Sequence, residues 1–198
     1  MRQYVFNGSV FVPDGPVEYK SIDYSDVLCH DSRSDFDTSG IAHEALLSAM
    51  KDSIPGKHTG TLVVVANIFG NKGKLPLAEI LNEERPDLGR VYAKDPEELS
   101  RVLLEISDKS SPFHDGAIII DDDTSRVLDC NVLLIPPPFI NGSEHEEHYR
   151  GTRHKTAVDY SRLSTTMLTC CLSINGENVL KEFRRGAITY DSENHSPA

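Results

Sequence analysis

The stretch SPFHDGAIIIDDD, residues 111–123, places an apolar run, Ala117–Ile120, directly after a polar His-Asp-Gly triplet. A short apolar run bounded by turn residues is typical of a buried strand. This strand would begin beside Asp115, and burying a lone carboxylate is costly unless it is paired, protonated or bound to a cation. The simpler interpretation is that Asp115 and Gly116 only form a turn into the strand, since Asp-Gly is a common turn pair.

Helices and strands alternate on both sides of this stretch. Before it, TLVVVANIF (61–69) predicts a buried strand, and DPEELSRVLLEIS (95–107) predicts a helix capped by Asp95. After it, 126–135 predicts the second strand of a β-hairpin across the acidic turn 121–123. This alternation predicts the α/β class, with a mixed β-sheet flanked by helices.

Further elements are predicted on the same grounds: helices over 41–50, 76–84 and from Thr152 onward, and strands over 165–174 and 178–190. Thr38 or Ser39 is the expected cap of the first of these helices.

The length of 198 residues favours one domain. We expect an N-terminal extension of strands and a loop over 1–39, the domain itself over 40–190, and a disordered tail over 191–198, which has nothing to pack. Since no run is long and apolar enough to span a membrane and no signal peptide is recognisable, we expect a cytoplasmic protein without a membrane partner.

The net charge of -11 argues against a broad nucleic-acid footprint, so no nucleic-acid partner is expected. A small cationic pocket for one nucleotide would still be compatible with this charge. The four cysteines form no CxxC pair and are interpreted as small buried hydrophobes in a reducing compartment: Cys29, Cys130, Cys170 and Cys171.

A second candidate site is GTRHKTA, 151–157, at the start of the last predicted helix. Free backbone N–H groups and the helix dipole make a helix N-terminus suitable for an anion. Four consecutive side chains add a hydroxyl, a planar fork, a ring N–H and a point charge: Thr152, Arg153, His154 and Lys155. The set suits a di- or triphosphate, although a capped helix with solvated cations would show the same residues.

A third constellation is EHEEHYRGTRH, 144–154, in which three histidines alternate with acids. His145 and His148 lack the helical i, i+4 spacing of the HExxH zinc proteins, so the pattern is a weak zinc signal. A metal-dependent phosphohydrolase that uses Asp115 and these two histidines remains a minor alternative.

SPFHDGAIII followed later by GTRHKTA resembles the diadenylate cyclase (DAC domain) family, which pairs an Asp-Gly-Ala motif with a Gly-Thr-Arg-His-Arg motif. The order of the elements is also similar, and the resemblance covers residues 40–185. It implies a DAC-like nucleotide-binding domain over 40–190. Residues 1–39 have no counterpart in the family, and their apolar pieces joined by tight turns predict an N-terminal β-hairpin extension.

The resemblance implies condensation of two ATP molecules into cyclic di-AMP, with release of pyrophosphate. It implies catalytic positions at Asp115, Gly116 and Ala117, with Asp115 also binding Mg²⁺ or Mn²⁺. The nucleotide and phosphate positions that it implies are Gly151, Thr152, Arg153, His154 and Lys155. Two subunits would face each other as a homodimer or within a higher oligomer, each presenting one ATP.

The chain differs from the family pattern at three places. Lys155 stands where the family usually has Arg, Ser161-Arg162 where it has Ser-Glu, and Leu172-Ser173-Ile174 where it tends to have Ser-Glu-Glu. These differences motivate an alternative function, a catalytically weakened module that binds a nucleotide or cyclic dinucleotide and regulates a partner.

Overall fold

The computed structural model describes residues 4–6, 11–13, 20–28, 37–81, 88, 95–135, 152–174 and 178–194. The helices are α1 (Ser25–Leu28), α2 (Thr38–Asp52), α3 (Pro96–Ser107) and α4 (Thr152–Ser161). The strands are β1 (Tyr4–Phe6), β2 (Phe11–Pro13), β3 (Ser21–Asp23), β4 (Thr61–Ala66), β5 (Lys74–Pro76), β6 (Ala78–Ile80), β7 (Ala117–Asp121), β8 (Val127–Leu134), β9 (Thr166–Ser173), β10 (Val179–Arg184) and β11 (Ala187–Asp191).

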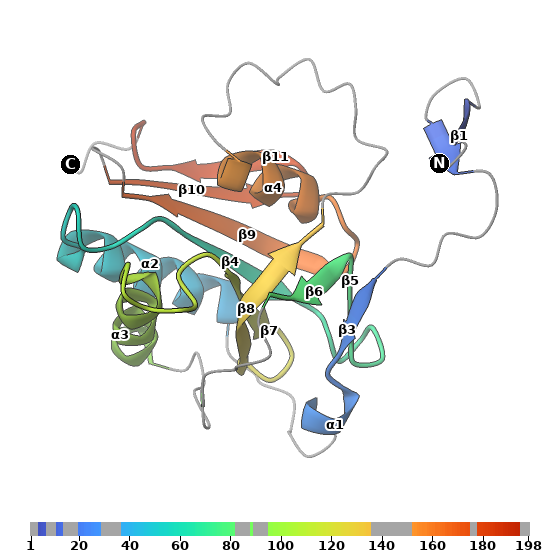
Figure 1. Cartoon of the computed structure of the whole chain (residues 1–198), viewed down its shortest axis with the longest axis horizontal. Coiled ribbons are helices and arrows are strands. Elements are labelled where there is room, and N and C mark those ends of the chain that lie inside the picture. Colours follow the sequence, from blue (N-terminus) through green and yellow to red (C-terminus); the bar gives the residue numbers. More distant parts are fainter. Residues whose placement is uncertain are drawn as a thin grey trace.

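A seven-stranded β-sheet forms the centre of the domain, and helices pack against it (Figure 1). It has seven strands in the order β11-β10-β9-β4-β7-β8-β6, and only β4 and β7 run parallel in it. Two small antiparallel pairs, β1–β2 and β3–β5, accompany it. The predicted class, α/β with a mixed sheet flanked by helices, is therefore confirmed.

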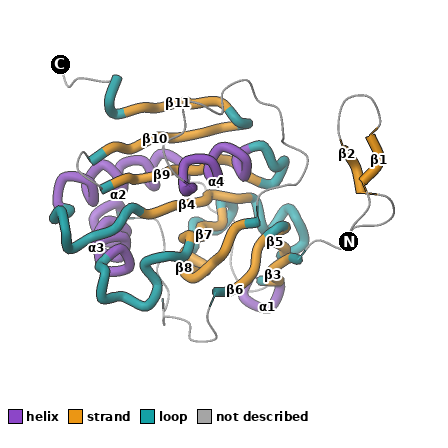
Figure 2. The backbone as a smooth tube through the Cα atoms, turned by 45° about the horizontal axis from the view of Figure 1, so that its top comes forward, coloured by secondary structure: helices purple, strands orange, loops and turns teal. Residues whose placement is uncertain are grey.

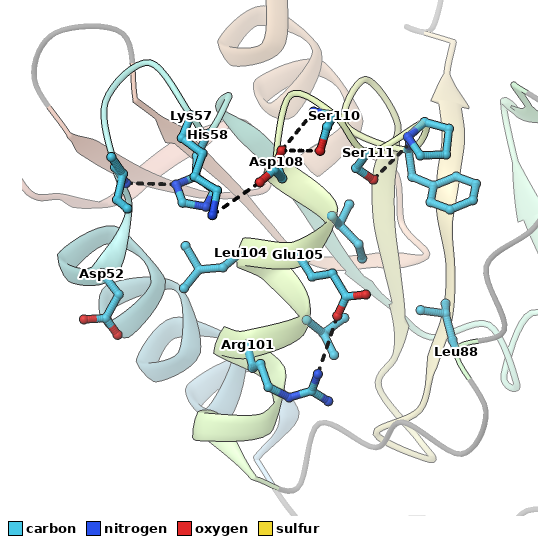
Figure 3. A pocket seen from close by; sticks show the side chains of 15 residues that line it. Asp52, Lys57, His58, Leu88, Arg101, Leu104, Glu105, Asp108, Ser110 and Ser111 are labelled. Carbon is cyan, nitrogen blue, oxygen red and sulfur yellow. Dashed lines mark hydrogen bonds and ion pairs between the residues drawn. The ribbon is translucent and has the colours of Figure 1, made fainter.

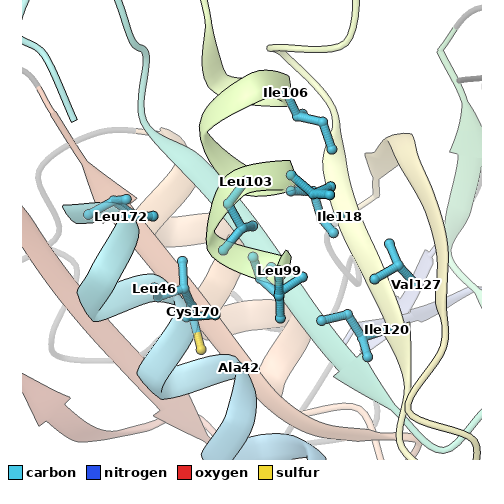
Figure 4. Close-up of a cluster of buried hydrophobic side chains, with 14 of the residues drawn as sticks. Ala42, Leu46, Leu99, Leu103, Ile106, Ile118, Ile120, Val127, Cys170 and Leu172 are labelled. Atoms are coloured by element: carbon cyan, nitrogen blue, oxygen red, sulfur yellow. The ribbon is translucent and has the colours of Figure 1, made fainter. Parts of the chain in front are cut away.

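The central strands β4 and β7 are buried on both faces, which explains their continuous apolar sequences. On one face, Val63 and Ile118 belong to a core cluster with α2 and α3, which Figure 4 shows from close by. On the other face, Val64 and Ile119 belong to a second cluster with α4. The tube in Figure 2 shows the same sheet from another angle. Each such aliphatic side chain contributes about 1.5–3 kcal/mol when fully buried.

The two long helices begin at aspartates. Asp95 caps α3 as predicted, because its carboxylate accepts hydrogen bonds from the N–H groups of Glu97 and Glu98. The cap of α2 is Asp37, which accepts from the Gly40 N–H, and not Thr38 or Ser39. Thr38 is buried instead, and its hydroxyl donates to the carbonyl of Asp122.

The helix predicted over 76–84 is wrong within the described residues. Pro76 ends β5, and Leu77 has a positive φ of 54°, which breaks any helical run. Ala78–Ile80 then pairs with β8, opposite Leu134–Val132. The apolar spacing at 77, 80 and 81 matched a helix, but pairing with the sheet edge decides the backbone.

The C-terminal region differs from prediction in two ways. The single strand predicted over 178–190 is a hairpin, because Arg185 and Gly186 both have positive φ and turn β10 into β11. The tail was expected to have nothing to pack from 191 onward, yet Asp191 is buried and lies 3.2 Å from the ammonium of Lys181. Residues 195–198 lie outside the described residues.

The chain ahead of α2 also contributes to the core. Ile22 and Tyr24 are buried in the cluster that contains α4, and β3 pairs with β5. The domain limits at 39 and 190 remain predictions. Among the described residues, none of the helices has the length and apolar character needed to cross a membrane.

Candidate functional site

Asp115 lies in the turn that leads from α3 into β7. Its side chain is 74% exposed, whereas every residue of β7, Ala117–Asp121, is buried. The expectation that burial of the strand would draw this carboxylate into a dry environment is therefore wrong. The backbone turn at 112–116 keeps Asp115 at the surface, where it is accessible to a ligand.

Arg153 brings the two sequence motifs together. It lies in the first turn of α4, and its Nη2 is 3.4 Å from Oδ1 of Asp115. The same nitrogen donates to the carbonyl of His114 at 3.3 Å. The structure therefore places the arginine of the second motif directly against the aspartate of the first, at the N-terminal end of the central strand β7.

His114 fixes the shape of this turn. Its ring Nδ1 donates to the carbonyl of Ser111 at 2.6 Å, and its Nε2 lies 3.4 Å from Oδ2 of Asp115. The hydroxyl of Thr59 bonds the carbonyls of Ser107 and His114, which attaches the turn to the start of β4. Asp115 is thus flanked by an imidazole and a guanidinium.

Gly60 was not recognised from the sequence. A Cβ atom on it would lie 2.5 Å from the carbonyl of Leu172 and 3.3 Å from Nη1 of Arg153. The missing side chain therefore leaves the space in which the guanidinium lies. A glycine directly ahead of the β4 run was the signal that sequence reasoning could have used.

Gly116 packs closely against the backbone of β8. A Cβ atom on it would lie 2.5 Å from the carbonyl of Cys130 and 2.7 Å from the Cα of Asn131, both in β8. Gly116 is buried, as is Ala117, which pairs with Leu62 of β4. Both residues that follow Asp115 are therefore packed within the sheet.

The remaining residues of the second motif differ in exposure. Thr152 and Lys155 are exposed on the first turn of α4, Arg153 is half-buried and His154 is buried. Gly151 lies outside the described residues. Thr152, Arg153 and Lys155 therefore lie on the first turn of α4, and Arg153 contacts Asp115.

No cluster of three or more His, Cys, Asp or Glu side chains suited to a metal occurs within the described residues. Asp115 offers a carboxylate at the start of β7, with the His114 ring nearby. Mg²⁺ is commonly held by one or two carboxylates while substrate phosphates and water fill the other positions. The exposed Asp115 carboxylate fits that pattern, so the donor set is compatible with a metal that arrives with a nucleotide.

The histidine-rich stretch 144–151 lies outside the described residues, so the zinc and phosphohydrolase hypotheses on His145 and His148 remain untested.

The residues at one of the three departures from the family pattern, Ser161-Arg162, make contacts within the fold. The Ser161 hydroxyl donates to the Val158 carbonyl and accepts from the Gly186 N–H, while Arg162 pairs with Asp159 at 3.7 Å.

A mixed sheet flanked by helices, with Asp115 and Arg153 in contact at the start of β7, defines an α/β domain. Residues 49–179 match the family model described as "DisA bacterial checkpoint controller nucleotide-binding". Because the match spans most of the sequence, the chain belongs to this DAC family of nucleotide-binding domains, and the recognition made from the two motifs is confirmed.

Individual proteins resemble the chain only over a short stretch or at low sequence identity. The chain is 36% identical over 76 residues to the DNA integrity scanning protein DisA of Symbiobacterium thermophilum, a stretch that covers 38% of this chain and 19% of that protein. A hypothetical membrane-spanning protein of Bacillus cereus shares the fold, with a TM-score of 0.50 and 19% identity over 83% of this chain and 65% of that one. A double mutant of DacA from Staphylococcus aureus gives a TM-score of 0.49 and 18% identity, covering 78% and 84% of the two chains.

Proposed function

We propose that the chain is a diadenylate cyclase that condenses two ATP molecules into cyclic di-AMP. The contact between Asp115 and Arg153 carries the proposal, because it joins the two motifs of the family in one exposed place. Membership of the DAC family supports a nucleotide as the ligand.

The reaction consists of two equivalent substitutions. In each, the 3′-oxygen of one ATP forms a bond to the α-phosphorus of the other, and the bond from that phosphorus to the bridging oxygen breaks. Pyrophosphate leaves with the electron pair of the broken bond. The exposed Asp115 carboxylate accepts the hydroxyl proton or passes it to solvent. When bound, Mg²⁺ or Mn²⁺ held by Asp115 and the phosphates would neutralise charge on the α-phosphate.

The second motif binds and orients the triphosphate. Arg153 offers a planar fork that can leave Asp115 and take a phosphate oxygen, while the backbone N–H groups at the start of α4 provide a fixed anion site. The exposed Thr152 and Lys155 add a hydroxyl and a point charge. His154 and Gly151 are assigned to this motif from the resemblance. Since each subunit presents one nucleotide, turnover requires two subunits face to face.

The decisive experiment is a product assay. The full chain is incubated with ATP or GTP and Mg²⁺ or Mn²⁺, and the products are separated and identified by mass spectrometry. Cyclic di-AMP and pyrophosphate are expected from ATP, and none from Asp115→Asn. Glu97→Gln, an exposed acid on α3 outside the site, is the matched control and should retain the wild-type rate. No cyclic dinucleotide with either nucleotide and either metal would refute the proposal.

A second candidate function, a nucleotide- or cyclic-dinucleotide-binding module without turnover, is favoured by the side chains that replace the family acids. Arg162 pairs with Asp159 of α4, and Ile174 is a core residue. This module would bind ATP or cyclic di-AMP in calorimetry and yield no product on long incubation. The cytoplasmic location remains part of the prediction.

A further inference from the structure

A pocket of about 850 Å³ lies over α3, between the end of α2 and the turn that leads to β7 (Figure 3). We call it the α3 pocket. Its apolar lining includes Ile54, Leu104 and Phe113. Ile54 is 54% exposed, so the pocket presents apolar surface to solvent. The volume is within the range of about 300–1,000 Å³ that is usual for small-molecule sites.

The charged residues of the α3 pocket neutralise one another in pairs. Lys57 pairs with Asp108 at 3.5 Å, and Arg101 pairs with Glu105 at 3.5 Å. A further acid, Asp52, also lines the pocket. Because both cations already face a carboxylate and acids outnumber them, the pocket disfavours a phosphate group.

His58 supplies a polar group inside the α3 pocket. The residue is 6% exposed. Nδ1 accepts a hydrogen bond from the Ile54 N–H at 2.8 Å, which requires the neutral tautomer with its proton on Nε2. Within the described residues, that Nε2–H has no hydrogen-bond acceptor. A ligand that covers His58 would separate this donor from water, so a ligand with a matching acceptor is favoured over one without.

We propose that the α3 pocket binds a small, flat heteroaromatic molecule without negative charge, whose ring acceptor takes the hydrogen bond from Nε2 of His58. The apolar walls at Leu104 and Phe113 favour an aromatic body. The Nε2–H donor of His58 selects for an unprotonated ring nitrogen or a carbonyl oxygen. The excess of acids at the pocket tolerates a neutral or weakly cationic ligand and selects against nucleotides.

This site is separate from the one proposed for ATP. Asp115 and Arg153 do not line the α3 pocket, although Phe113 belongs to the same turn as Asp115. A ligand there would therefore contact the turn that carries the catalytic aspartate without occupying the phosphate surface. The inference does not depend on turnover of ATP.

The test uses benzimidazole and indole as probes, because the two bicyclic rings have the same shape and only benzimidazole carries a ring acceptor. Binding to the full chain is followed by two-dimensional ¹H–¹⁵N NMR at neutral pH. We expect saturable shifts of pocket amides with benzimidazole, and binding of indole at least about tenfold weaker, because indole leaves the His58 donor unsatisfied. Leu104→Trp, a half-buried position on α3, should abolish binding by filling the pocket.

Three controls separate this site from the proposed active site. Asp115→Asn and Ile188→Gln, on the exposed edge strand, should leave benzimidazole binding unchanged. His58→Phe should equalise the two probes, with folding checked by the melting temperature since the Ile54 bond is also lost. The proposal is overturned if neither probe saturates, if both bind equally to the wild type, or if ATP with Mg²⁺ displaces benzimidazole competitively.

Discussion

Nη2 of Arg153 lies 3.4 Å from Oδ1 of Asp115, although the two residues are 38 positions apart in the sequence. One comes from the turn before β7 and the other from the first turn of α4, so the contact depends on the whole central sheet. The pair is accessible, with side chains 35% and 74% exposed. Exposed ion pairs contribute only about 0–1 kcal/mol to folding, so this contact is available for function at little cost in stability.

The first prediction separates function from stability at this pair. Arg153→Lys keeps the charge but loses the planar fork, and we expect cyclic di-AMP formation to fall at least about tenfold. The free energy of unfolding should change by less than about 1 kcal/mol. Urea titration followed by circular dichroism, beside the product assay, provides both values. A loss of stability well above that limit would show that the pair holds the fold.

Gly116→Ala is predicted to destabilise the fold, because the added methyl group would collide with β8. Its Cβ would meet the backbone at Cys130 and Asn131, which cannot move aside as a side chain tip can. We expect a loss of about 1–3 kcal/mol in the free energy of unfolding, as is usual for overpacking. Thermal melting of the two proteins without nucleotide measures this loss. If Gly116→Ala melts like the wild type but loses ATP binding, the glycine serves the ligand directly.

The third prediction concerns the acidic turn after β7. Burial raises the pKa of Asp122, and the nearby Asp123, Asp121 and Asp37 raise it further. The folded protein therefore binds this proton more tightly than the unfolded chain, and ionised Asp122 destabilises the fold at neutral pH. Asp122→Asn should raise the melting temperature at pH 7 by about 1–3 °C.

Two measurements test whether ionised Asp122 destabilises the fold: the pH dependence of the stability gain, and a control at Asp108, whose pKa is shifted in the opposite direction. The gain from Asp122→Asn should shrink as the pH falls through the raised pKa and vanish below 3.8, the ordinary value. Hydrogen bonds from Ser110 lower the pKa of Asp108, so its contribution is present above 3.8 and is lost on acidification. Asp108→Asn should therefore not stabilise the protein at pH 7. Equal gains from both variants would point to net charge alone.

Much of the fold could be predicted because its signals are local. The apolar run Ala117–Ile120 is buried on both faces of the sheet, as its continuous apolar sequence indicates. Asp95 caps α3, as the sequence also indicates. The helix predicted over 76–84 was wrong because its backbone is set by pairing with β8, a partner about fifty positions away. Local periodicity carries no information about such a partner.

The sequence predicted which residues belong to the candidate site, but not how they are arranged in space. The motifs singled out Asp115 and Arg153, whereas their contact and the space left by Gly60 arise only when β4, β7 and β9 align. The exposure of Asp115 was not predictable from the apolar run beside it. A turn of five residues between helix and strand sets that exposure, and its path depends on bonds from Thr59 and His114.

The last prediction concerns the cysteines, which the sequence indicated to be buried and inert. Cys130, Cys170 and Cys171 are buried free thiols. Burial raises the pKa of Cys130 and of Cys171 to about 12, and that of Cys170 well above its usual range. The thiolate is the reactive form, and at pH 8 only roughly one part in ten thousand of such a thiol is present as thiolate. Cys29→Ser, which removes the thiol outside the described residues, should show no rapid reaction with Ellman's reagent when folded.

The same variant in guanidinium should release three thiol equivalents, which is the internal control. Reaction should reappear in the folded protein only as the pH rises toward the raised pKa values, or at a rate equal to that of global unfolding. Rapid modification of one thiol at pH 8 would mean that the sheet opens locally at β8 or β9. Since β9 contributes Leu172 to the wall behind Gly60 and Arg153, that opening would also loosen the proposed site, and ATP with Mg²⁺ should slow the modification.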